Sequence, residues 1–344
     1  MDSSLLARML DARGIDTSEK VEQFLHPDLE RDWINPYEIK GMEQVADSVE
    51  AALKAGKKIL IFGDYDLDGV SATAVMMRGL RAIDKHINAG MTVDYFLPSR
   101  FSEGYGLTEK SVSRLLEMDD LPDLIISVDC GITASKEIGR LKEAGIDVVV
   151  TDHHEKSENI PTDIPLIDPE AEDADNPNAI LAGVSVALKL VQCLGCRLGL
   201  PNVWLDLIDL ATLGTIADVM PLIGQNRALV SEGIKKINEE TRPSLRAILD
   251  VAGKKAGELS SIDISYIITP RLNAAGRMDK ADLAVDLLMC DDYSQSYNLA
   301  LEIEALNNQR REITDKILEQ ATFRAKTIMG NNPESRSLVL ADES

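Results

Sequence analysis

The chain has 344 residues and a formal net charge of −22, with 36 basic against 58 acidic side chains. This excess of acid excludes a general surface for polyanions, so a nucleic-acid substrate would need a local basic track or a bound cation. Four cysteines exclude a disulfide framework, and no apolar run approaches the ~18 residues of a membrane span, so we expect a cytoplasmic protein without membrane contact.

Residues 1–50 are expected to form a helical lead-in. SEKVEQFLHP and MEQVADSVEAALKAG carry apolar residues at helical spacing and end at Pro27 and Gly56. The lead-in precedes the region that we expect to form the main domain, residues 51–292.

In that region, short apolar runs alternate with helical patterns. Strands are expected near 58–63, 91–97, 123–128 and 147–151, with helices near 71–80, 108–118 and 133–144 between them. Such alternation implies βαβ crossovers, so the predicted fold class is α/β, with a parallel sheet and flanking helices.

The pattern becomes wholly helical from about residue 180. Residues 293–328 contain no Gly or Pro and are typical of a long helix that connects two units. SLVLAD, close to the C-terminus, resembles the beginning of a strand. We therefore expect residues 329–344 to be the start of a truncated second subdomain.

Acids and imidazoles follow three of the expected strands. They are Asp64, Asp66 and Asp68 in GDYDLDG, Asp129 in SVDCG, and Asp152, His153 and His154 in VVVTDHH. In open α/β sheets the carboxyl ends of the strands meet in one crevice. Carboxylates cannot share a dry cleft unless cations neutralise them, so the pattern predicts a metal site with more than one ion.

An EF-hand is the alternative for GDYDLDG, because DxDxDG opens a calcium loop. The Glu that this loop needs is absent, since the position six after Gly69 is Val75. Asp129 by itself is also a candidate helix cap, and the histidine pair is a candidate for a buried hydrogen-bonding role.

A further acid, Asp218 in LATLGTIADVMPL, ends an apolar helical run and is a candidate ligand. Aspartate oxygens with about one imidazole suit Mn²⁺ or Mg²⁺, and two such ions support phosphoester hydrolysis.

Two segments offer substrate contacts. PSRFSEGYGL carries Arg100 beside a Gly-Tyr-Gly turn, and PRLNAAGRM carries Arg271 and Arg277 around Asn273 and several small residues. Arginine suits bidentate phosphate binding, so Arg100, Arg277 and Asn273 are the expected substrate-binding residues, with Arg271 a weaker candidate. Cys193 and Cys196 form a CxxC without a second pair or a nearby His, which favours helix-borne thiols over a zinc site.

GDYDLDG, DCG, DHH and GTIAD, in this order and spacing, resemble the four motifs of the DHH phosphoesterase superfamily. The lead-in, the PSRFSEGYGL loop and PRLNAAGRM narrow the resemblance to bacterial single-strand-specific 5′→3′ DNA exonucleases, over nearly the whole chain. The resemblance implies metal ligation by Asp66 and Asp68 with Asp64 close by, a bridging Asp129, and completion of a site by His153 and Asp218. It also implies that His154 contacts the scissile phosphate.

The resemblance further implies single-stranded DNA as substrate in DNA repair and recombination, with a single-strand-binding protein and a helicase as partners. The alternative is a DHH enzyme for short oligonucleotides, cyclic dinucleotides or pyrophosphate, which the charge of −22 suits at least as well. The lead-in and LNAAGR favour the exonuclease. An inactive scaffold is a third hypothesis, but scaffolds tend to lose ligands and this chain keeps every candidate acid and both histidines.

Overall fold

The fold is built on one five-stranded parallel sheet. The computed structural model describes residues 3–155, 160–170, 176–331 and 336–341. The strands run in the order β2-β1-β3-β4-β5, and every neighbouring pair is parallel. Their bounds are β1 Lys58–Phe62, β2 Thr92–Phe96, β3 Leu124–Val128, β4 Asp147–Thr151 and β5 Leu166–Ile167. The predicted parallel α/β class is thus confirmed, while the short β5 was not expected.

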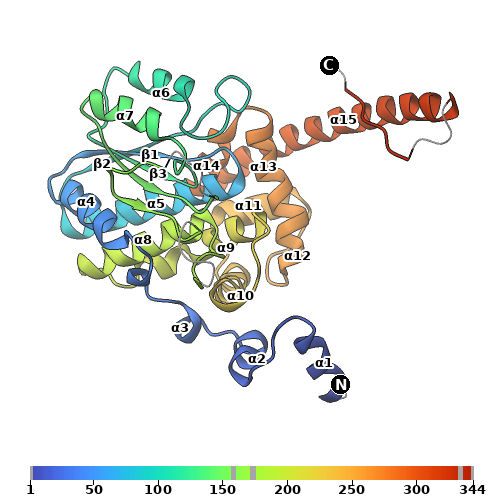
Figure 1. The fold of residues 1–344 in the computed structure, drawn as a ribbon, viewed down its shortest axis with the longest axis horizontal. Helices are drawn as coiled ribbons and strands as arrows, with labels where there is room; N and C mark the ends of the chain where they lie inside the picture. Colours follow the sequence, from blue (N-terminus) through green and yellow to red (C-terminus); the bar gives the residue numbers. More distant parts are fainter. Residues whose placement is uncertain (1–2, 156–159, 171–175, 332–335, 342–344) are drawn as a thin grey trace.

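Alternate side chains of the strands enter two separate cores. Ile59 and Ile61 of β1 belong to a large core with the helices α4, α5, α8 and α9, whereas Leu60 and Phe62 belong to a smaller core with α6 and α7. Figure 1 shows these helices on opposite sides of the sheet. Their bounds are α4 Met42–Lys54, α5 Leu67–Ile87, α6 Glu109–Leu116, α7 Ser135–Glu143, α8 Gly183–Arg197 and α9 Ile208–Ala217. Burial on both faces explains why the strands are continuous apolar runs.

The helix after β1 begins earlier than the sequence indicated. We expected a helix over 71–80 with the acidic cluster in the preceding loop, but α5 starts at Leu67. The reason is a local cap: Oδ1 of Asp66 accepts hydrogen bonds from the backbone N–H of Asp68 (2.9 Å) and Gly69 (3.1 Å). Asp68 therefore lies in the first turn of a long buried helix, which fixes its position.

The N-terminal helices lie below the sheet layer in Figure 1, as expected for a helical lead-in. Their bounds are α1 Ser3–Asp11, α2 Ser18–Leu25, α3 Leu29–Asp32 and a 3₁₀ turn η1 Pro36–Glu38. Helices α2 and α3 pack on α10, whereas α4 packs on β4, β5 and α8. The domain division at residue 51 stays a prediction.

A buried lysine joins the lead-in to the core. Nζ of Lys189 on α8 donates to the carbonyl of Ile34 at 2.6 Å and lies 3.8 Å from the ring centroid of Trp33. Trp33 in turn stacks on Trp204 and donates from Nε1 to Gln192. Lys189 is fully buried, and this burial lowers its pKa to about 7.

From residue 183 to residue 331 the described chain is mostly helical, as expected. The remaining elements are η2 Val203–Leu207, α10 Gly224–Glu239, α11 Pro243–Val251, α12 Ser261–Asp263, a π turn η3 Ile264–Ile268, α13 Thr269–Arg277, α14 Ala281–Met289 and α15 Tyr293–Asn331. PRLNAAGRM thus lies mostly in α13. None of the described helices is long and apolar enough to cross a membrane.

Helix α15 includes the long helix expected over 293–328, and its role as a connection between two units stays a prediction. Its first part packs against α11, α13 and α14, and its second part projects from the body in Figure 1. The strand expected in SLVLAD is absent: residues 336–341 are described and form no strand, since no neighbouring strand offers them hydrogen bonds. The other residues of the predicted subdomain start, 332–335 and 342–344, lie outside the described residues.

Candidate metal centre and substrate pocket

The ends of three neighbouring strands bring the polar motifs to one edge of the sheet. Asp64 follows β1, Asp129 follows β3, and Asp152 with the two histidines follows β4. The hydrogen-bond ladder continues past the strands, because the N–H of Asp129 donates to Thr151 O (3.0 Å) and that of Asp152 to Ile167 O (2.9 Å). The clusters are therefore aligned by the sheet itself, as the sequence predicted.

Two helix N-termini hold Asp68 in place. It lies in the first turn of α5, and its carboxylate accepts from the N–H of Gly183 (2.7 Å) and of Val184 (3.0 Å) at the start of α8. The start of α8 lies so close to the carboxylates that position 183 requires glycine, because a Cβ there would lie 2.5 Å from Oδ1 of Asp129. Asp129 itself has a φ of 60°, a conformation that Asp tolerates better than most residues.

Three groups of side chains in the described part of the chain are close enough to share a cation. In each group, ligand atoms lie within 4.8 Å of one another. The groups are Asp64, Asp66 and Asp129; Asp68, His153 and Asp218; and Asp129, His153 and His154. Asp129 and His153 each belong to two groups, so the arrangement could hold two ions side by side. The residues that the sequence singled out as metal ligands or catalytic groups are all brought together.

The chemistry of these groups fits a divalent cation. Oδ1 of Asp64, Oδ1 of Asp129 and Nε2 of His153 are buried without a hydrogen-bond partner in the described structure. Burial, followed by the charge of Asp66, raises the pKa of Asp64 to about 7. Burial, followed by the charge of Asp68, raises the pKa of Asp129 well above its usual range. A bound cation would satisfy these atoms and offset the repulsion, which is what an oxygen-rich Mn²⁺ or Mg²⁺ site needs.

The two histidines differ in charge. Burial lowers the pKa of His153 to about 4, so its imidazole is neutral at pH 7 and Nε2 is free to ligate. Burial also acts to lower the pKa of His154, but the hydrogen bond with Asp152 (Nδ1 to Oδ1, 2.7 Å) and the charges of the neighbouring acids together outweigh it and raise the pKa to about 9. His154 is therefore a cation beside the acids.

Asp152 and Tyr105 support His154. The carboxylate of Asp152 also accepts from the N–H of Ile132 (2.9 Å) and of His153 (2.7 Å), and although burial opposes it, the bond with His154 lowers its pKa. The hydroxyl of Tyr105 donates to the carbonyl of Asp129 at 2.9 Å and lies 3.1 Å from Nδ1 of His154. The sequence placed Asp152 in the acidic cluster but assigned no role to it, and it assigned none to Tyr105. The signal for Tyr105 was its place between Gly104 and Gly106, which both have positive φ.

The expected substrate contacts line a cavity beside this centre. It measures about 260 Å³ and is formed by Asp64, Tyr65, Asp66, Arg100, Tyr105, Ala217, Asn273 and Arg277. Asn273 also has a structural part, because its Oδ1 accepts from the N–H of Leu67 at 2.8 Å. Arg271 points elsewhere: its Nε lies 2.6 Å from Oε2 of Glu304 and it donates to Ile267 O.

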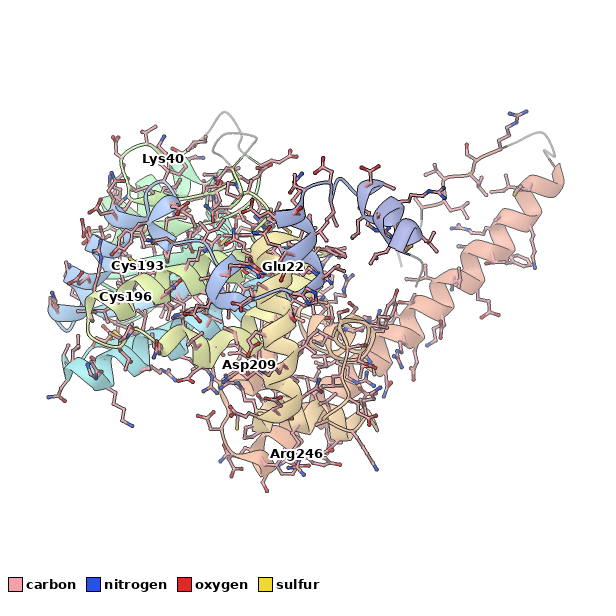
Figure 2. All side chains as sticks on the ribbon, turned by 90° about the horizontal axis from the view of Figure 1, so that it is seen from below. Glu22, Lys40, Cys193, Cys196, Asp209 and Arg246 are labelled. Atoms are coloured by element: carbon pink, nitrogen blue, oxygen red, sulfur yellow. The ribbon has the colours of Figure 1, made fainter. Side chains whose placement is uncertain are left out.

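The CxxC pair lies away from the metal groups. Cys193 and Cys196 are free thiols on α8, the first buried and the second exposed. Figure 2 shows both at the end of the body opposite the projecting part of α15. Neither is part of a metal-binding group among the residues described, in line with the expectation of helix-borne thiols.

Comparisons with known proteins agree with this geometry. Residues 58–215 match the family described as DHH family, N-terminal domain. The Bacillus subtilis single-stranded-DNA-specific exonuclease RecJ is 39% identical over 318 residues, which cover 92% of this chain and 38% of that protein. The chain spans from 38% to 55% of the length of six RecJ relatives.

Two solved structures are similar over most of the chain. RecJ in complex with Mn²⁺ from Thermus thermophilus is 35% identical with a TM-score of 0.75, and the match covers 90% of this chain and 43% of that one. A structure of exonuclease RecJ bound to manganese is 38% identical with a TM-score of 0.74, covering 88% of this chain and 73% of that one.

Proposed function

Because the chain belongs to the DHH family and is similar to RecJ exonucleases over most of its length, we propose that it is a metal-dependent exonuclease for single-stranded DNA. The observation that carries this proposal is the set of three overlapping ligand groups beside a cavity that contains two arginines. Carboxylates and an imidazole at such spacing serve phosphodiester hydrolysis, and arginines suit the phosphates of the substrate.

The proposed metal ligands are shared between two Mn²⁺ or Mg²⁺ ions. They are Asp64, Asp66, Asp68, Asp129, His153 and Asp218. Asp129 and His153 both belong to two groups, but only a carboxylate could offer one oxygen to each ion, so Asp129 would be the bridge. When bound, such a pair of ions lowers the pKa of a water and stabilises the leaving oxygen. Asp68 can keep its orientation without the ions, since the backbone of α8 holds both of its oxygens.

His154 is proposed to stabilise the charge that develops on the scissile phosphate. It is a cation near the metal ligands, and Asp152 and Tyr105 fix its ring. A preorganised charge in a partly buried position gains more from a developing oxyanion than the same charge in water. Together with Asp129 and His153, it makes up the proposed catalytic set.

Arg100, Arg277 and Asn273 are proposed to bind the substrate backbone. The two guanidiniums line the cavity, and no ion pair ties either of them to an acid among the described residues. Both guanidiniums are therefore available to the phosphates of a substrate. The amide N–H₂ of Asn273 supplies a neutral donor, because its oxygen is already used by Leu67.

We further propose 5′→3′ digestion in DNA repair and recombination, in the cytoplasm, with a single-strand-binding protein and a helicase as partners. The support is the similarity to single-stranded-DNA-specific exonucleases over 92% of the chain. The alternative is a phosphodiesterase for short oligonucleotides or cyclic dinucleotides, which would need only the 260 Å³ cavity.

A digestion series tests these proposals. Purified chain with Mn²⁺ is given 5′-labelled and 3′-labelled single strands, a duplex of the same sequence, and a dinucleotide. Stepwise release of mononucleotides from the 5′ end of the single strand alone is the expected result. Cleavage of the dinucleotide as fast as the single strand, or faster, would support the alternative. Release of mononucleotides from the 3′ end would overturn the proposed 5′→3′ direction.

A further inference from the structure

A second cavity continues from the substrate pocket toward α15. It measures about 390 Å³ and shares Arg100 and Arg277 with the pocket beside the metal ligands. Its other walls include Phe101, Arg310 and Ile313. The two cavities are therefore adjacent, and the shared arginines form the boundary between them.

The second cavity is cationic in an acidic protein. Three of its seven lining residues are arginines and none is acidic. No ion pair joins Arg100, Arg277 or Arg310 to a carboxylate within the described ranges. Burial, followed by the charges of Arg277 and Arg311, lowers the pKa of Arg310. Such a cluster favours an anionic ligand.

Arg310 has hydrogen-bonding capacity to spare. Its Nη2 donates to Oδ1 of Asn307 at 3.1 Å, which orients the guanidinium, while its Nε is buried without a partner. A buried charged donor without an acceptor is destabilising, so the site favours a ligand with strong acceptor oxygens. A phosphodiester offers such oxygens in the geometry of a guanidinium.

Phe101 supplies an apolar surface at the same place. Its ring is 72% exposed, the same fraction as Phe323 on the projecting part of α15. Unlike Phe323, it lines a cavity next to arginines. Exposed aromatic rings beside cations are the usual elements of a single-strand groove, where the ring stacks on a base and the cations hold the backbone.

From these observations we propose that the cavity lined by Phe101, Arg277 and Arg310 is a second nucleotide subsite, which holds the single strand one phosphate beyond the scissile one. This inference rests on the proposed function and deepens it. It makes the enzyme selective for strands with at least two phosphodiesters. A dinucleotide has no second phosphodiester for Arg310, so it would occupy the first pocket without this contact.

The test uses the full chain with Mn²⁺ and oligothymidylates of two, three and eight nucleotides. Arg310→Gln should raise KM for the trimer and the octamer about 5-fold or more and leave KM for the dinucleotide unchanged. Phe101→Ala should raise KM for the octamer by a similar factor. Arg310→Gln should also reduce the slope of log affinity against log salt by about 1. Arg311→Gln and Phe323→Ala are matched controls outside the cavity, and both should behave like the wild type.

Binding gives a readout that does not depend on hydrolysis. Fluorescence anisotropy of a labelled octamer, measured with each variant in an Asp129→Asn background, should show the same order of affinities. If the wild type cleaves all three substrates and Arg310→Gln changes none of them, the subsite is wrong and the proposed function stands. A different outcome is that the chain cleaves none of the substrates, while Arg310→Gln weakens octamer binding and Arg311→Gln does not. In that case the subsite stands and the proposed function falls. Absence of both binding and cleavage would overturn both.

Discussion

Nε2 of His153 lies 3.0 Å from Oδ1 of Asp129, yet both atoms are buried and neither makes a hydrogen bond. The pair is not an ordinary ion pair, because burial lowers the pKa of His153 to about 4 and leaves its ring neutral at pH 7. A neutral imidazole and a carboxylate that face each other in this way are two donors to a shared cation. Removing either donor should therefore impair the metal centre.

Asp129→Asn should lower the rate of Mn²⁺-dependent hydrolysis about 100-fold or more, because a bridging carboxylate is needed to hold both ions. Asn also tolerates the φ of 60°, and loss of one charge relieves repulsion among the acids, so the free energy of unfolding in EDTA should hold or rise. Initial rates at saturating Mn²⁺ and thermal unfolding in EDTA measure the two effects. Asp94→Asn, on the exposed side of β2, is the control. Full activity of Asp129→Asn would refute the bridging role.

Tyr105→Phe should lower kcat by about 10-fold or more while Mn²⁺ binding stays unchanged. The hydroxyl holds the carbonyl of Asp129 and faces the ring of His154, and loss of such a supporting contact around a metal site typically costs that much. Rates and calorimetric Mn²⁺ titration separate the two effects. The matched control is Tyr95→Phe, which removes a hydroxyl bonded to Asp286 on another part of the surface. A weaker Mn²⁺ affinity in Tyr105→Phe would instead mean that Tyr105 supports the ligands.

Asn273→Ala should lower the free energy of unfolding by about 1 kcal/mol, because the N–H of Leu67 loses its acceptor at the start of α5. Asn273→Asp keeps that acceptor and should be close to the wild type in chemical denaturation. Both variants lose the amide donor to the substrate pocket, so both should raise KM for single strands. If Asn273→Asp binds single strands with the same affinity as the wild type, the role of Asn273 is limited to accepting the hydrogen bond from Leu67.

The buried Lys189 should make stability depend on pH. Its pKa is about 7 in the folded protein against 10.5 in the unfolded chain, so between these values the unfolded chain binds more protons. Stability should therefore rise from pH 7 to pH 10, and Lys189 contributes about 1.4 kcal/mol per pH unit. Below pH 7 both states are protonated and the contribution is constant.

Lys189→Met isolates this effect, since all other titrating groups are common to both proteins. The free energy of unfolding of the wild type minus that of Lys189→Met, from denaturant titrations at pH 7, 8, 9 and 10, should increase with pH. A difference that is flat over this range would show that the ammonium stays charged over Trp33 in the folded state.

The local features of the site follow from the sequence by itself. Apolar runs before Asp64, Asp129 and Asp152 define strands because those strands are buried on both faces, and parallel strands place their carboxyl ends at one edge. The residue types there, several acids with few neutralising cations, already required a metal. Their proposed division into ligands, bridge and phosphate contact stays a prediction until the variants are measured.

Only the tertiary structure decided which partners support these residues. No local pattern shows that the N–H groups of Gly183 and Val184 hold Asp68, or that Tyr105 reaches His154, because these partners are far apart along the chain and meet through packing. For the same reason Arg271 turned to Glu304 while Arg277 turned to the pocket, although both stand in one short segment. Residues six apart on a helix project roughly 120° from each other, and which neighbour each side chain meets is set by how α13 packs against α15.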